Sequence, residues 1–226
     1  KTLLAFALGR CPFLYASSAA VYGDGRRGFR EVPVCEEPLN VYAFSKFLFD
    51  RHVRRLLPRP PTQVLGLRYF NVYGPQENHK GRMASVVYQF HRKASAGEPL
   101  ELFAGSREFV RDFVHVDDAV ALNLHFLEQP GTSGIFNCGT GRARSFLDLA
   151  QATVRHYPGA RIVEIPFPAD LAGKYQAYTQ ADLAALRAAG YGREFTALEA
   201  GVASYVAVLR SAGGYHREPD PPALHA

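Results

Sequence analysis

The chain has 226 residues, 47% of them hydrophobic, which supports a folded protein with one large domain or two small ones. The net charge of +5 comes from dispersed lysines and arginines, so it favours a site for anionic small molecules over nucleic-acid binding. The three cysteines are widely spaced and match no metal-ligand pattern, and no apolar stretch reaches the roughly 18 residues of a membrane span, so we expect a reduced, cytoplasmic protein.

The first residues are expected to be the end of an amphipathic helix. Leu3, Leu4, Ala7 and Leu8 recur at helical spacing before Gly9. Because the chain starts within such a pattern and not with methionine, we expect an N-terminal portion to be missing.

The next elements follow a strand, helix, strand order. An apolar run into Ser18 predicts a strand with a polar carboxyl end, a helix is expected from Asn40 to Leu57, and residues 63–70 form a second apolar run. This order predicts a parallel pair in a doubly wound α/β sheet, whose carboxyl edge binds ligands. The apolar stripe of the helix is expected to comprise Phe44, Phe47, Leu48, Val53 and Leu56.

The remaining chain continues to alternate between helices and strands. We expect a Gly/Pro/Asn-rich loop at 71–85, a helix to about 97, strands at 100–104, 112–116, 134–138 and 161–165, and helices at 117–129, 145–157, 179–189 and 195–211. Asp117 and Asp118 are expected to cap a helix. We predict a dinucleotide-binding part formed by residues 1–71 and 112–136, a mainly substrate-binding part formed by 72–111 and 137–211, and a disordered tail at 212–226.

Tyr42 and Lys46 lie four residues apart on the expected helix, so their side chains share one face. A phenol titrates near 10, and a cation at about 4 Å supplies about 4 kcal/mol, which corresponds to about three pKa units. We therefore expect Lys46 to lower the pKa of Tyr42 so that the phenol transfers a proton. The spacing also occurs by chance, but Ser18 at the end of the preceding strand can hydrogen-bond the same substrate oxygen. We expect Ser17 to be a turn residue bonded to backbone.

This arrangement resembles the extended short-chain dehydrogenase/reductases, in which a strand-end serine and Tyr-x-x-x-Lys precede a strand that runs into Asn71. Six segments are similar to the family of ADP-L-glycero-D-manno-heptose 6-epimerases, and the match as a whole covers about residues 12–208. They are FLYASSAAVYG, EEPLNVYAFSKFLFD, RYFNVYGPQENHKGRMAS, LFAGSREFVRDFVHVDD, GIFNCGTGRARSF and KYQAYTQADLAALRAAGY.

The resemblance implies an isomerase of lipopolysaccharide core-heptose precursor synthesis that uses NADP, with NAD as the alternative. It would oxidise the C6 hydroxyl of an ADP-heptose to a ketone and return the hydride to the opposite face. It also implies a homo-oligomer, with no nucleic-acid or membrane partner.

The resemblance assigns Ser18, Tyr42, Lys46 and Lys80 as catalytic residues, and Lys46, Val72 and Lys80 as cofactor-binding residues. Without it, Lys80 would be interpreted as a solvated loop lysine. Arg111 suits a pyrophosphate because a guanidinium binds two oxygens at once. Arg82 and Gln89 stand where the family pattern has a serine and a histidine. The implied substrate-binding residues are Ser18, Asn71, Arg82, Gln89, Phe103, Ala104, Gly105, Ser106, Arg111 and Tyr175.

Three alternatives remain open at this stage. A nucleotide-sugar 4,6-dehydratase would have an Asp-Glu pair where this chain has Ala19 and Ala20. A UDP-sugar 4-epimerase is the closer competitor, and a non-catalytic nucleotide-binding protein is the third. The chain carries no Gly-x-x-Gly-x-x-Gly turn after a first strand, so we expect weak cofactor binding by these residues alone and an exposed strand edge in the sheet.

Overall fold

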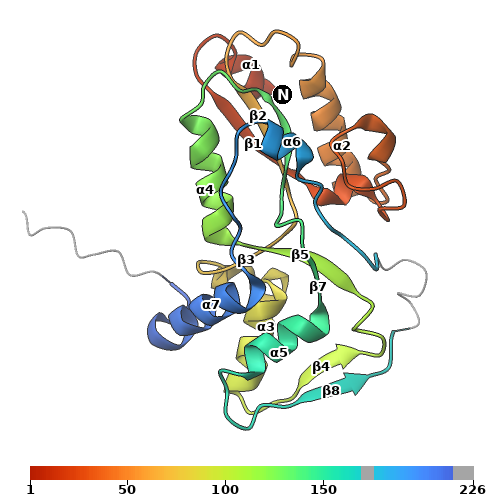
Figure 1. Ribbon diagram of the computed structural model, residues 1–226, viewed down its shortest axis with the longest axis vertical. Helices are drawn as coiled ribbons and strands as arrows, with labels where there is room; N and C mark the ends of the chain where they lie inside the picture. Colours follow the sequence, from red (N-terminus) through yellow and green to blue (C-terminus); the bar gives the residue numbers. More distant parts are fainter. Residues whose placement is uncertain (169–175, 216–226) are drawn as a thin grey trace, which may run out of the picture.

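The computed structural model describes residues 1–168 and 176–215 and has two layered parts joined by a small central sheet (Figure 1). The first part is built on a parallel sheet with the strand order β1-β2-β6. Its strands are β1 (Phe13–Ser18), β2 (Val64–Tyr69) and β6 (Gly134–Cys138). The pairing of β1 with β2 is parallel, as the strand, helix, strand order predicts.

Helices cover both faces of this sheet, so the expected doubly wound α/β arrangement is confirmed. On one face, Leu65 and Leu67 of β2 pack in a core with α4 (Val116–Leu127). On the other face, Val64 packs with α1 (Thr2–Ala7) and α2 (Val41–Arg54). Because successive strand side chains point to opposite faces, a strand buried on both faces must be apolar throughout, as most of β2 is.

The second part packs three helices against a strand pair. The helices are α3 (Val86–Ser95), α5 (Phe146–Val154) and α7 (Leu198–Ala212), which share one apolar core. The strands β4 (Leu100–Phe103) and β8 (Ile162–Ile165) pair in parallel below them in Figure 1.

The central sheet connects the two parts. Its strands are β3 (Asn71–Tyr73), β5 (Val110–His115) and β7 (Ala143–Ser145), in the order β3-β5-β7. Short 3-10 helices complete the described chain: η1 (Ala19–Tyr22), η2 (Pro33–Cys35) and η3 (Asn78–Met83).

The segment before the last helix differs from expectation. The helix expected at 179–189 is only α6 (Ala184–Ala188), and it packs against β6 of the first part. Leu186, Tyr191 and Phe195 join the core beneath α4, so this segment leaves the second part and returns to the first. Before α6 the chain is extended, because Val110 and Tyr178 form an isolated bridge.

Helix α2 begins where the sequence predicts, because the Asn40 side chain accepts a hydrogen bond from the backbone N–H of Ala43 at 2.8 Å. The predicted apolar stripe is partly wrong, since Phe44 and Leu48 are 48% and 45% exposed, whereas Val53 is buried. In α1, Leu3 is exposed although Leu4 is buried. The spacing of apolar residues does not show how much of a helix surface the sheet covers.

The capping prediction for α4 is also wrong. His115 is the N-cap residue, and its Nδ1 accepts from the N–H of Asp117 at 3.3 Å. Asp117 and Asp118 lie in the first helical turn, where a carboxylate interacts favourably with the helix dipole. The expected exposed edge is present: among the described strands, β1 pairs only with β2. Of the described helices, none is long and apolar enough to cross a bilayer.

Candidate active site

Ser18 and Asn71 lie at the same edge of the first sheet. Ser18 is the last residue of β1 and pairs in register with Tyr69 of β2, and Asn71 follows two residues later. Because the strands are parallel, their carboxyl ends meet at one edge. The Ser18 hydroxyl accepts a hydrogen bond from the N–H of Ala20 at 3.2 Å, which starts η1 and leaves its proton available as a donor.

Tyr42 and Lys46 lie on α2, which packs against β1 and η1. The Lys46 ammonium donates to the carbonyl oxygen of Ala16 at 2.8 Å and lies 5.8 Å from the centroid of the Tyr42 ring. The two side chains therefore lie on one side of the helix, as their spacing predicts. Tyr42 is 57% exposed, so its hydroxyl is accessible to a substrate.

Ser17 is not the turn residue that we expected. It lies within β1, is buried, and donates from its hydroxyl to the carboxylate of Asp50 at 2.9 Å. The Tyr15 hydroxyl donates to the same carboxylate at 2.8 Å, and its burial, together with the charge of Asp50, raises the pKa of Tyr15. Asp50 lies one helical turn after Lys46 in α2, so these bonds anchor that helix to β1.

A buried charge cluster extends this anchor to β2. The Arg68 guanidinium, fully buried, donates to Asp50 at 2.9 Å and also binds Glu36. Burial alone would raise the pKa of Glu36, but Arg54 and Arg68 together lower it. A buried ion pair needs such extra hydrogen bonds to offset the loss of hydration. We did not predict this cluster; its signal in the sequence is an arginine inside the apolar run QVLGLRYF.

Asn71, Val72 and Lys80 gather around one cleft of about 320 Å³. The ammonium of Lys80 lies 3.9 Å from the carboxylate of Glu77, which also lines the cleft. The other lining residues come from β3, β5, α5 and the start of α3: Phe70, Tyr73, Met83, Ala84, Ser85, Val86, Val87, Phe113 and Leu149.

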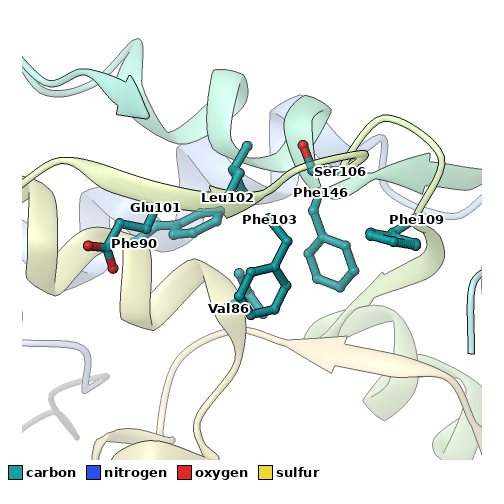
Figure 2. A pocket seen from close by; sticks show the side chains of 8 residues that line it. All are labelled: Val86, Phe90, Glu101, Leu102, Phe103, Ser106, Phe109 and Phe146. Atoms are coloured by element: carbon teal, nitrogen blue, oxygen red, sulfur yellow. The ribbon is translucent and has the colours of Figure 1, made fainter. Parts of the chain in front are cut away.

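A second cleft, of about 220 Å³, contains Phe103 and Ser106 (Figure 2). Phe103 projects from the end of β4 toward Val86, while Phe109 and Phe146 close the opposite side. Val86 lines both clefts, so the two adjoin at the start of α3. The remaining lining residues are Phe90, Glu101 and Leu102.

The other residues of the 103–106 segment have distinct surroundings. Gly105 and Ser106 line a neighbouring cavity of about 260 Å³. The backbone N–H of Ala104 donates to the carbonyl of Ile165 at 2.8 Å, which extends the β4–β8 pairing. This pairing holds the segment at the mouth of the second cleft.

Arg111 is buried beside the second cleft. Its guanidinium donates to the carbonyl of Val110 at 2.9 Å, binds the carbonyl of Gln176, and lies 5.6 Å from the ring centroid of Phe146. The guanidinium is therefore held within the fold by backbone carbonyls.

Arg82 and Gln89 flank the Lys80 loop. Arg82 is exposed at the end of η3. Gln89 of α3 donates to the carbonyl of Gly81 at 2.8 Å, so its side chain contacts the loop backbone. Tyr175, the last of the predicted site residues, lies outside the described residues, as do residues 216–226 of the expected tail.

A family model for the NAD dependent epimerase/dehydratase family matches residues 2–139. An ADP-L-glycero-D-manno-heptose-6-epimerase of Brachyspira hyodysenteriae is 56% identical over 203 residues, which are 89% of this chain and 64% of the relative. The chain thus spans less than two thirds of that relative's length.

Two solved structures extend the comparison. The ADP-L-glycero-D-manno-heptose-6-epimerase of Helicobacter pylori superposes with a TM-score of 0.80 at 32% identity, over 92% of this chain and 63% of that chain. The UDP-glucose 4-epimerase of Thermus thermophilus, in complex with NAD, superposes with a TM-score of 0.76 at 27% identity, over 93% of this chain and 68% of that chain.

Proposed function

Because this chain belongs to the NAD dependent epimerase/dehydratase family, we propose that it forms the active site of an ADP-L-glycero-D-manno-heptose 6-epimerase. The observation that carries the proposal is the 56% identity, over 89% of the chain, to a heptose epimerase. The reaction would invert C6 of the sugar through a transient 6-keto compound, without net oxidation.

Tyr42 would move the proton of the C6 hydroxyl. Its side chain is exposed on α2, which packs against the strand that ends at Ser18, and we expect its phenol and the Ser18 hydroxyl to hydrogen-bond one substrate oxygen. The Lys46 ammonium, held by the carbonyl of Ala16, would stabilise negative charge on the phenol as the proton leaves.

Lys80 would be the second acid/base group, acting on the epimer whose C6 hydroxyl does not contact Tyr42. Inversion requires that the C6 oxygen lose and regain a proton in both epimers, whose hydroxyls point in different directions, and a second acid/base group would serve the epimer that Tyr42 does not. Lys80 comes from η3, whereas Tyr42 comes from α2, and Lys80 lines a cleft with Asn71, which would hold the substrate. Phe103 to Ser106, Arg111 and Tyr175 would bind the nucleotide diphosphate; the aromatic second cleft, which can stack a base, supports this.

The residues present fit the nicotinamide end of a dinucleotide. The Lys46 ammonium has three N–H donors and spends one on Ala16, so others can hold ribose hydroxyls, and the half-buried Val72 offers an apolar contact. When bound, NADP would supply the hydride acceptor and donor of the reaction. We propose NADP over NAD on the family resemblance.

We further propose a cytoplasmic homo-oligomer in which residues 1–71 and 112–136 bind the cofactor and residues 72–111 and 137–211 mainly bind the substrate, apart from the segment around α6 that packs in the first part. Free cysteines at 11, 35 and 138 fit a reducing compartment. The exposed Val41, Phe44 and Leu48 on α2 support self-association through that helix.

The test is interconversion of the two ADP-heptose epimers, followed by NMR, on the chain in the longest form its gene encodes. We expect turnover with the ADP-heptoses and none with UDP-glucose. Tyr42→Phe should lower turnover by about 100-fold or more, whereas Tyr178→Phe, which removes another exposed hydroxyl, should leave it unchanged. Full turnover of Tyr42→Phe, or a preference for UDP-glucose, would contradict the proposal.

A further inference from the structure

Glu77 is a buried carboxylate next to the exposed Lys80. Its side chain is 4% exposed, whereas that of Lys80 is 49% exposed. One oxygen of Glu77 accepts from the N–H of Ser85 at 2.7 Å, and the other accepts from the hydroxyl of Ser85 and from that of Tyr205 at 3.0 Å. These hydrogen bonds fix the carboxylate at the floor of the cleft.

The only cation that forms an ion pair with Glu77 in the described part of the chain is Lys80, at 3.9 Å. Glu77 is the N-cap residue of η3 and Lys80 lies three residues later, with its N–H donating to the carbonyl of Glu77 at 2.9 Å. In a 3-10 turn, side chains at this spacing lie directly above one another. Burial of a carboxylate is costly unless a positive charge faces it, so the arrangement favours an ammonium over the Glu77 oxygens.

The backbone on either side of Glu77 is held by the segment that follows α7. The N–H of Gln76 donates to the carbonyl of Gly214 at 2.9 Å, and the Asn78 amide donates to the carbonyl of Gly213 at 2.6 Å. Gln76 has a φ of +73°, a left-handed conformation that few residues other than glycine adopt. The segment after α7 thus holds the backbone around Glu77, while the Lys80 side chain is half exposed.

We infer that Glu77 is the positioning residue for Lys80: its charge holds the ammonium over the cleft, while Tyr205 and Ser85 hold Glu77. The purpose of this positioning, to present Lys80 to C6 of the sugar, rests on the proposed function. Glu77 itself needs no contact with the substrate.

The first test does not depend on catalysis. The folded protein is labelled briefly with acetic anhydride, and the acetylation of Lys80 is measured by peptide mass spectrometry against Lys93, which pairs with Glu101 elsewhere. Glu77→Gln keeps the shape of the side chain but removes its charge. Its amide oxygen can still accept from the N–H of Ser85, and its amide N–H can donate to the hydroxyls of Ser85 and Tyr205. Glu77→Gln should raise the ratio of Lys80 to Lys93 labelling about fivefold, because the amine is released.

Two further variants serve as controls. Tyr205→Phe removes one hydrogen bond but keeps the charge of Glu77, so the labelling ratio should change less than about twofold. Glu77→Asp keeps the charge but withdraws it by one methylene, and should give an intermediate ratio even where Glu77→Gln folds poorly. An unchanged ratio in both Glu77 variants would overturn the inference.

The second test is a double-mutant cycle on turnover. Glu77→Gln should lower kcat about tenfold with little change in KM, and should have less than about a twofold effect in a Lys80→Met background, because it acts through that lysine. Equal losses in both backgrounds would indicate a general structural role and overturn the inference. Full turnover of Lys80→Met would instead contradict the proposed function, and the labelling ratio would still decide the role of Glu77.

Discussion

Asp112 shows how a single buried carboxylate joins distant parts of the chain. One oxygen accepts from the N–H and the hydroxyl of Thr140, both at 2.7 Å, and the other accepts from the N–H groups of Gly141 at 2.8 Å and Ala181 at 3.0 Å. Burial raises the pKa of Asp112, although these hydrogen bonds act in the opposite direction. The second oxygen faces two backbone donors, so only an acceptor fits there.

We predict that Asp112→Asn lowers the free energy of unfolding by about 3 kcal/mol. In one orientation the new amide NH2 group faces the N–H donors of Gly141 and Ala181, and in the other it faces the N–H of Thr140, so donors oppose each other in both. The matched control is Asp118→Asn. Asp118 accepts from the N–H of Thr196 at 2.9 Å and from its hydroxyl at 3.1 Å, and an amide can accept the first and donate to the second.

The control variant should therefore lose about 1 kcal/mol or less. Urea denaturation of the three proteins measures both losses. Equal losses for the two variants would show that the geometry of the donors around Asp112 is unimportant.

At the scale of elements, α7 is placed by a glycine that allows close approach to β3. A Cβ atom built on Gly201 would lie 2.1 Å from the hydroxyl oxygen of Tyr73, which itself faces the carbonyl of Leu198. The helix can pack this closely only because residue 201 has no side chain.

Gly201→Ala should consequently destabilise the protein by about 1–3 kcal/mol through overpacking. Helix propensity alone predicts the opposite, a gain of about 1 kcal/mol. Gly131→Ala is the control: no atom lies within 4 Å of its added Cβ, and the effect should stay within about 0.5 kcal/mol. Unfolding midpoints in urea distinguish the two predictions, and a stabilised Gly201→Ala would refute ours.

At the scale of the whole molecule, the second part brings three segments together around His91. Its Nδ1 binds the hydroxyl of Tyr157, which follows α5, and Arg210 of α7 lies 5.8 Å from the Tyr157 ring centroid. Burial and, secondarily, the charge of Arg210 lower the pKa of His91 from 6.5. The folded state therefore favours the neutral imidazole.

This lowered pKa predicts a pH-dependent stability. The unfolded chain takes up a proton at His91 first, so the contribution of His91 is intact above pH 6.5 and is lost as the pH falls from 6.5 toward the folded pKa. Urea denaturation at pH 7.5 and pH 5.5 measures how much the free energy of unfolding falls between the two pH values. This decrease should be smaller for His91→Gln than for the unchanged protein. An equal loss would mean that other groups account for the whole effect.

The sequence determined the order of elements and much of the candidate site. Local signals sufficed for β1, β2 and the Asn40 cap of α2, because apolar runs and capping residues act within a few positions. The spacing of Tyr42 and Lys46 placed both on one face for the same reason. The candidate role of Lys80 came from the family resemblance and not from periodicity.

The tertiary structure decided what depends on partners far along the chain. Ser17 can be buried because Asp50, 33 residues later, accepts a hydrogen bond from its hydroxyl, and Glu77 is held by Tyr205, 128 residues later. Arg68 is tolerated inside a strand only because two carboxylates from other segments meet it. Burial and charge pairing are properties of the assembled fold, so no local pattern encodes them.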